Sequence, residues 1–63
     1  MITYKISSLD YKKGEAEFAF KGLSTDTKPT SEYEGYAIAN GSSYFNIDTQ
    51  ELNFYDKDAE DWV

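Results

Sequence analysis

The chain has 63 residues with twelve acidic and six basic side chains, which predicts a single domain over residues 1–63 with a net charge of −6. It contains neither cysteine nor histidine, which excludes disulfides, thiolate metal sites and the commonest general base of enzymes. The acidic balance argues against nucleic-acid binding, because that function requires a basic face that displaces phosphate counterions.

Two apolar alternations open the chain and predict a pair of strands. Residues 1–6 and 15–20 carry apolar side chains at every second position, which is typical of half-buried strands. The turn-forming residues between them end at Gly14 and favour an antiparallel hairpin with a long connection. The apolar side of this hairpin comprises Ile2, Tyr4, Ile6, Ala16, Phe18 and Phe20.

The middle of the chain is polar and weakly patterned. Residues 21–31 contain the only proline and are predicted to form a flexible loop. Ser31 and Glu34 have the spacing of a capping box, although Gly35 would end a helix after one turn. A short helical turn near 31–35 and an irregular turn are both compatible with this stretch.

A short strand over residues 36–39 is predicted next, followed by Asn40-Gly41, the dipeptide most typical of tight hairpin turns. The last hairpin joins strands 43–48 and 51–55 through a two-residue loop, Thr49-Gln50, because this register pairs side chains of like character. The predicted pairs are Ile47 with Leu52 and Phe45 with Phe54 on one face, and Asn46 with Asn53 and Tyr44 with Tyr55 on the other.

The predicted fold is all-β, with a small single antiparallel sheet of about four to five strands. The apolar face of the last hairpin is predicted to be core. The opposite, semi-polar face is either ordinary surface or an interface, where tyrosine is enriched. Trp62 is either a ring that closes the core or an interface anchor, and the first role is favoured because so small a core needs its largest ring. The candidate interface residues are Tyr44, Asn46, Asn53, Tyr55 and Trp62.

Acidic residues concentrate at the end of the chain, where residues 48–63 hold six acids and one lysine. The candidate acidic surface consists of Asp56, Asp58, Glu60 and Asp61. Calcium binding is not predicted, because an EF-hand loop needs glycine at its sixth position, here Asp61, and glutamate at its twelfth. No catalytic, cofactor-binding or metal-binding residue is predicted, and the serines and threonines have no histidine to activate them.

The run from Asn40 to Val63 resembles small hypothetical proteins of tailed bacteriophages and prophages. Their pattern is Asn-Gly-Ser, a strand, Asp-Thr-Gly, a second strand ending in an aromatic-Asp pair, and a tryptophan. The upstream stretch at residues 24–30, STDTKPT, is similar to one that often precedes it. The sequence departs at Gln50, where a glycine is usual, so that a longer or bulged loop is an alternative to the two-residue loop. The matching positions are Asn40, Gly41, Ser42, Ile47, Asp48, Thr49, Tyr55, Asp56 and Trp62.

The resemblance implies a phage protein from the structural gene region, which acts through contacts with itself or with a head or tail protein. The alternative is an acidic, DNA-mimic-like inhibitor of a basic host protein that binds nucleic acid. In both cases we expect a non-enzymatic protein without cofactors, nucleic acid or membrane as partners. No basic region followed by an apolar run opens the chain, so we expect location in the host bacterial cytoplasm or the virion, without secretion.

Overall fold

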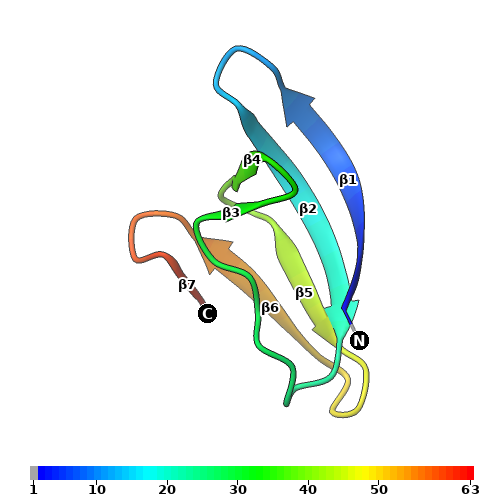
Figure 1. The fold of residues 1–63 in the computed structure, drawn as a ribbon. Coiled ribbons are helices and arrows are strands. Elements are labelled where there is room, and N and C mark those ends of the chain that lie inside the picture. Colours follow the sequence, from blue (N-terminus) through cyan, green and yellow to red (C-terminus); the bar gives the residue numbers. More distant parts are fainter. Residues whose placement is uncertain (1) are drawn as a thin grey trace.

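The computed structural model describes residues 2–63, which form a single curled, mixed sheet without a helix (Figure 1). The all-β prediction is confirmed, but the sheet has seven strands instead of four to five and includes parallel pairs. The strands are β1 (Thr3–Asp10), β2 (Glu15–Gly22), β3 (Glu32–Tyr33), β4 (Tyr36–Ile38), β5 (Ser43–Asn46), β6 (Glu51–Asp56) and β7 (Asp61–Trp62).

The central strand is β2, whose alternation buries Ala16, Phe18 and Phe20. β1 pairs with it antiparallel along one edge, as the alternation of the two segments predicts, with a bulge between Ile6 and Ser8. Along the other edge, β4 pairs with the start of β2 and β5 with its end, and both pairs are parallel. The sheet then continues from β5 to β6 and β7 through antiparallel pairs.

The prediction that Asn40-Gly41 forms a tight hairpin turn is wrong. The strands on either side of it run in the same direction along one edge of β2, so the chain makes a detour there and does not reverse. Gly41 adopts a φ of 88° in this detour. The Ser42 hydroxyl donates to the Ala39 carbonyl at 2.8 Å and accepts from the Phe18 N–H at 3.0 Å. Ser42 therefore satisfies a β2 backbone group where the ladder is interrupted.

The short helical turn near 31–35 is also absent, and a hairpin between β3 and β4 takes its place. Tyr33 pairs with Tyr36, and the two residues between them, Glu34 and Gly35, have φ values of 53° and 84°. Two consecutive positive φ values are typical of a type I′ hairpin turn. Ser31 has a φ of 65°, which differs from the extended backbone of a helix N-cap, so the capping box does not form.

The last hairpin has a four-residue turn over residues 47–50, and its register differs from the predicted one by two residues. Gln50 has a φ of 62°, and its N–H donates to the Asn46 carbonyl at 2.7 Å. The longer loop, expected as the alternative because Gln50 stands where a glycine is usual, is therefore confirmed, and the two-residue loop is wrong. A shift of two residues leaves every side chain on its predicted face. The observed pairs are Ser43 with Phe54, Tyr44 with Asn53, Phe45 with Leu52 and Asn46 with Glu51.

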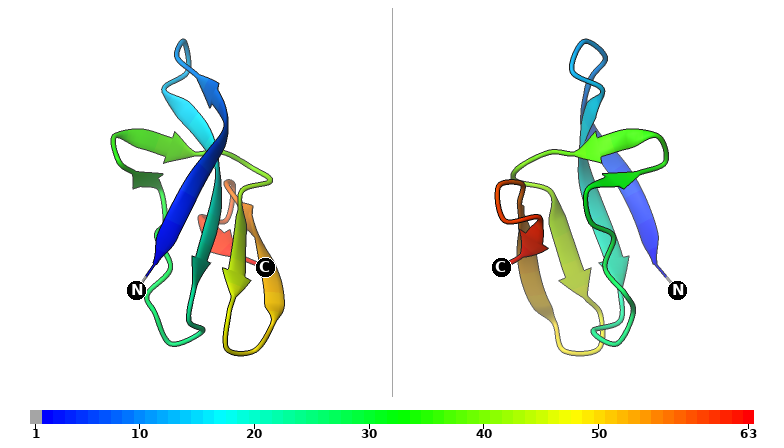
Figure 2. Two further views of the ribbon diagram at one scale, coloured as in Figure 1. Left: turned by 90° about the vertical axis from the view of Figure 1, so that its right-hand side faces the viewer. Right: turned by 60° about the vertical axis from the view of Figure 1, so that its left-hand side comes forward.

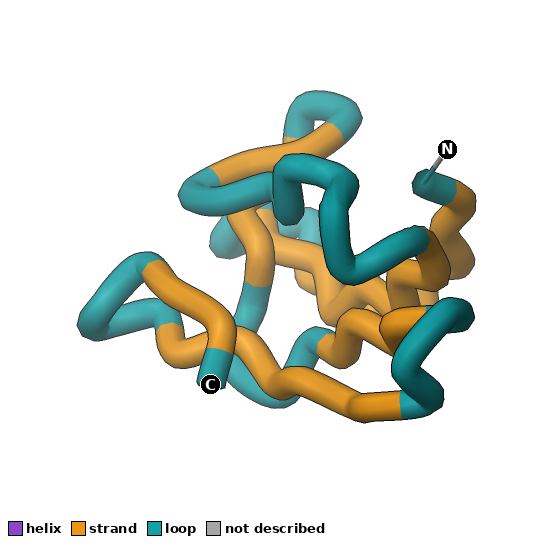
Figure 3. The backbone as a smooth tube through the Cα atoms, turned by 90° about the horizontal axis from the view of Figure 1, so that it is seen from below, coloured by secondary structure: helices purple, strands orange, loops and turns teal. Residues whose placement is uncertain are grey.

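The core lies on the inner face of the curled sheet. The crossover segment, residues 23–31, leads from the end of β2 to β3 (Figure 2), and Figure 3 shows the curl of the backbone from below. This segment provides backbone partners for polar atoms of the core, described below, and so serves as a second layer. Ring centroids of the core aromatics lie 5.0–6.5 Å apart. The buried hydrophobic residues are Ala16, Phe18, Phe20, Ile38, Tyr44 and Tyr55.

Candidate protein-docking surface

The two tyrosines of the predicted interface lie in the core, and the burial predicted for the two hairpin faces is therefore reversed. Tyr44 and Tyr55 are 0% and 3% exposed. Burial is possible because the crossover segment binds both hydroxyls: Tyr44 Oη donates to the Leu23 carbonyl at 2.8 Å, and Tyr55 Oη accepts from the Ser31 N–H at 2.9 Å. Burial raises the pKa of Tyr44. These side chains are not accessible to a partner.

The two asparagines of the predicted interface bond to each other on the same inner face. Asn46 is buried, and its Nδ2 donates to the Glu51 carbonyl at 3.0 Å and to Asn53 Oδ1 at 2.7 Å. Asn53 is half-buried, and its Nδ2 donates to the Val63 carbonyl at 3.4 Å. The amide pair therefore links β5, β6 and the end of the chain, which is a structural role.

Trp62 is half-buried and closes one side of the core, as the favoured prediction for this residue states. Its ring centroid lies 5.0 Å from that of Tyr55, 5.8 Å from Phe20 and 6.0 Å from Tyr44. Its Nε1 donates to the Pro29 carbonyl at 2.8 Å. The indole thus joins β7 to the crossover segment and is not directed outward as an anchor.

The opposite face of β5, β6 and the chain end carries large apolar side chains that the fold leaves exposed. Ile47 and Leu52 are each 52% exposed, Phe54 is 48% exposed and Val63 is 71% exposed, while Phe45 is half-buried. We call these five residues the outer apolar patch. Four of them are adjacent because Phe45 pairs with Leu52, Leu52 and Phe54 are alternate residues of β6, and Phe54 and Val63 exchange two backbone hydrogen bonds of 2.9 and 2.8 Å. Ile47 is the first residue of the turn that follows β5. Paired residues share a face of the sheet.

Charged residues border the outer apolar patch on two sides. Next to Phe45 in the sheet lies Lys21, and Lys5 lies one strand further out, opposite Ala19. Both lysines are exposed. Beyond Phe54 and Val63 lies the pair of Asp56 and Asp61. The patch therefore has a basic border at one corner and an acidic border at the opposite one.

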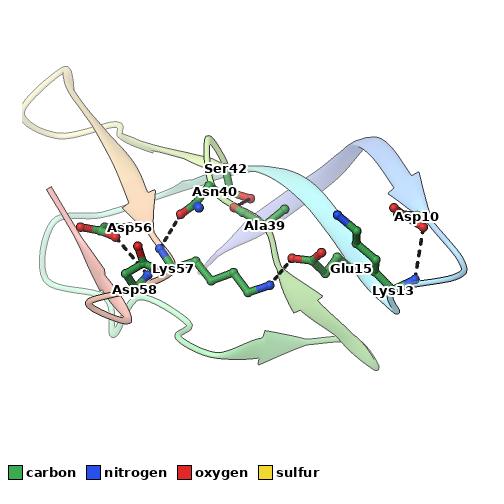
Figure 4. A network of polar contacts seen from close by, with 9 residues as sticks. All are labelled: Asp10, Lys13, Glu15, Ala39, Asn40, Ser42, Asp56, Lys57 and Asp58. Carbon is green, nitrogen blue, oxygen red and sulfur yellow. Dashed lines mark hydrogen bonds and ion pairs between the residues drawn. The ribbon is translucent and has the colours of Figure 1, made fainter.

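Most of the candidate acidic surface takes part in the turn between β6 and β7 (Figure 4). Asp56 Oδ1 accepts from the N–H groups of Asp58 and Ala59 at 3.0 and 3.3 Å. Glu60 Oε1 accepts from the Ser31 hydroxyl at 3.1 Å, and Asp61 Oδ1 accepts from the Trp62 N–H at 2.8 Å. Three of the four candidate carboxylates thus have partners within the fold.

The same turn is attached to the start of β2 by Lys57 (Figure 4). Its Nζ forms an ion pair with Glu15, and its backbone N–H donates to Asn40 Oδ1 at 2.6 Å. At the other end of the sheet, Asp48 accepts from the Ser24 N–H at 2.9 Å and from the Ser24 hydroxyl at 2.6 Å. These bonds to Ser24 lower the pKa of Asp48. Both contacts join segments that are distant in sequence.

A polar cavity of about 340 Å³ lies between the crossover segment and the β6–β7 hairpin. Asp26, one of its lining residues, has a lowered pKa because it accepts a hydrogen bond from the Leu23 backbone. Within residues 2–63, no three acidic side chains are grouped so that they could hold a metal ion. Nor does this part of the chain form a helix of the length and apolarity needed to cross a membrane. The lining residues are Asp26, Lys28, Thr30, Asn53, Asp61 and Trp62.

The sequence does not predict the outer apolar patch, because the pairs Ile47–Leu52 and Phe45–Phe54 are expected in the core. The signal in the sequence that could have identified the buried face is the pair of tyrosine hydroxyls, because a segment that crosses this face can bind them through its backbone. Comparisons of the chain with family models, with curated proteins and with solved structures found no match.

Proposed function

We propose that this chain is a non-enzymatic structural or assembly protein that acts through protein–protein contacts, with the outer apolar patch as its docking surface. The exposure of Leu52, Phe54 and Val63 on one face of the sheet, with the exposed Ile47 at the turn after β5, is the observation that carries the proposal. The likeness of residues 40–62 to small phage proteins supports a place in or on a virion.

The continuity of the patch makes it the candidate docking surface. Single exposed apolar side chains are common on soluble proteins, whereas the largest contiguous apolar patch of a monomer, typically about 300–600 Å², is often functional. Five large apolar side chains, about half exposed, amount to roughly 400 Å². Residues of this kind at the centre of an interface, surrounded by polar and charged side chains, match the usual anatomy of a docking surface.

The acidic-inhibitor alternative is less well supported. An inhibitor that imitates DNA presents a row of carboxylates with both oxygens directed to a basic partner, whereas Asp56, Glu60 and Asp61 each use one oxygen in a hydrogen bond within their own turn or with the crossover segment. The apolar patch has no role in such a mechanism.

Site-specific photocrosslinking tests the proposal. Phe54 is replaced by the photoreactive analogue p-benzoylphenylalanine in the cell where the protein acts, and Tyr11, 80% exposed at the β1–β2 turn, is replaced in the same way as the matched control. We expect a discrete protein adduct from position 54 and none from position 11. Absence of an adduct at position 54, or equal diffuse adducts at both positions, would contradict the proposal.

A further inference from the structure

We propose that the occupant of the outer apolar patch is a second copy of this chain, packed face to face in a two-fold symmetric dimer. This inference rests on the proposed function and names the partner of the docking surface. A two-fold axis through the patch places the same residues against each other, so Phe54 and Leu52 of one copy meet apolar side chains of the other. Apolar contacts of this kind need no complementary polar groups.

The distribution of apolar residues over core and surface supports a partner with an apolar surface, such as a second copy of the chain. Among residues 2–63, eight large hydrophobic residues are exposed, whereas six hydrophobic residues form the buried core. A chain of this length buries a smaller fraction of its unfolded surface than a larger domain does, about 60%, and association with another subunit is one of the usual sources of additional stability. Burial of the patch would move four of those eight exposed side chains out of water.

The charges at the two borders fit a second copy as well. Lys5 and Lys21 border the patch at one corner, and Asp56 and Asp61 border it at the opposite corner. An axis that exchanges the two corners brings the lysines of one copy onto the carboxylates of the other. The chain is thus complementary to itself at this face although its net charge is −6.

The area available sets the expected strength of the dimer. A standard stable interface buries about 800 Å² per partner, and the patch supplies roughly half of that. The charged borders supply the remaining contact. The dimer is therefore expected to be concentration-dependent, and the mass must be measured over a range of protein concentrations.

Sedimentation equilibrium of the full chain at low and high salt is the test. We expect the wild type to approach twice the mass of one chain as its concentration rises. Leu52→Thr/Phe54→Thr should raise the dissociation constant at least about 100-fold, because each lost contact is worth about tenfold. Threonine keeps the strand propensity at these outward positions, and circular dichroism checks that the variant folds. Tyr11→Thr is the matched control and should leave the dissociation constant unchanged.

A charge exchange keeps the proposal testable if the double threonine variant does not fold. Lys21→Glu should weaken the dimer, and Lys21→Glu/Asp61→Lys should restore it, since the two residues meet across the axis. A wild-type monomer at every concentration and salt would overturn the dimer, as would an unaffected dimer in the threonine variant. If the chain is monomeric but the probe at position 54 captures a different protein, the dimer is wrong and the docking function stands. If neither association is found, both proposals are wrong.

Discussion

At the scale of single residues, four non-glycine residues in the described part of the chain adopt left-handed backbone conformations. Ser31, Glu34, Gln50 and Glu60 have φ values between 52° and 65°. Each such residue costs on the order of 1 kcal/mol, because Cβ approaches the following carbonyl oxygen. All four lie in turns or at the end of the crossover segment, where the surrounding pairs hold the chain in place.

Replacement of Gln50 by glycine is expected to stabilise the protein. Glycine adopts the φ of 62° at this position without the Cβ contact, so the free energy of unfolding should rise by about 0.5–1 kcal/mol. Urea denaturation measures the change. Thr49→Gly is the matched control, because Thr49 is not among the residues with positive φ, and this variant should be less stable than the wild type. A loss of stability in Gln50→Gly would show that the turn differs from the one described.

The bonds between Ser24 and Asp48 predict a contribution to stability that depends on pH. The folded pKa of Asp48 lies below its ordinary value, so this contribution is present above the unfolded pKa of about 4 and is lost as pH falls through the folded pKa. Ser24→Ala removes the hydroxyl bond and should make the decline of stability in acid shallower. Urea midpoints measured over the acid range for wild type and Ser24→Ala test this. Identical pH profiles would refute the assignment.

At the scale of elements, three hairpin turns follow one design. Each contains four residues, starts after an Asx residue at the end of a strand, and ends at a residue with positive φ. In two of them the Asp side chain accepts bonds from backbone N–H groups of the turn, whereas Asn46 turns its amide into the core. The turns are 11–14 after Asp10 and ending at Gly14, 47–50 after Asn46 and ending at Gln50, and 57–60 after Asp56 and ending at Glu60.

Alternation in the sequence was sufficient for β1, β2, β5 and β6 and for the residues that share a face in them, but not for β3 and β7, which have two residues each. The β1–β2 pair follows from it, and in the last hairpin Phe45 and Leu52 share one face while Tyr44 and Asn53 share the other. Both results are local, because neighbouring side chains on a strand point to opposite sides. The buried face could not be identified in this way, since it depends on where the crossover segment passes. That segment packs on the tyrosine face through contacts between residues far apart in the sequence, and the alternation of side chains along a strand does not predict such contacts.

The parallel pairs were missed for a related reason. Asn-Gly is typical of reversals, but Ser42 satisfies the Phe18 N–H and allows the chain to continue along β2 after a detour. Hydrogen bonds between residues far apart in sequence leave no periodic pattern. The predicted interface residues Tyr44, Asn46, Asn53 and Tyr55 do share one face of the hairpin, but that face lies toward the core and not toward solvent.

Removal of the Ser42 hydroxyl should destabilise the fold strongly for so small a change. Ser42→Ala leaves the buried Phe18 N–H without its partner, which costs about 1–3 kcal/mol. Ser43→Ala is the matched control at the adjacent, half-buried position on the outer face, and should change stability by less than about 0.5 kcal/mol. Thermal and urea unfolding provide the measurement. Equal effects of the two substitutions would argue against the bridging role of Ser42.

At the scale of the whole molecule, a thin sheet is completed by the crossover segment and Trp62. The principal extents are 36, 22 and 15 Å, so no layer of helices covers the inner face. Pro29 and Ser31 of the crossover segment bond to Trp62 and Tyr55, and these contacts connect the two layers. Stability of a domain this small is marginal, so loss of one large ring should matter.

Truncation of Trp62 is expected to unfold a large fraction of the protein at moderate temperature. Trp62→Ala should lower the free energy of unfolding by about 2–4 kcal/mol, because a half-buried ring and the bond to Pro29 are lost together. Tyr11→Thr, at the exposed β1–β2 turn, serves as the control and should change it little. The melting temperature of each variant is the measurement. An unchanged melting temperature for Trp62→Ala would mean that the indole does not close the core.

The parallel pairing along β2 also determines how this chain reaches its native state. Phe18 and Ser42, which meet across that pairing, are 24 residues apart, whereas the β1–β2 and β5–β6 hairpins join neighbouring segments. Hairpins form in microseconds, but closing the loop between β2 and β5 must order the whole crossover segment first. Joining the two hairpins is therefore expected to limit the folding rate, which makes refolding slower than the length of 63 residues alone would indicate.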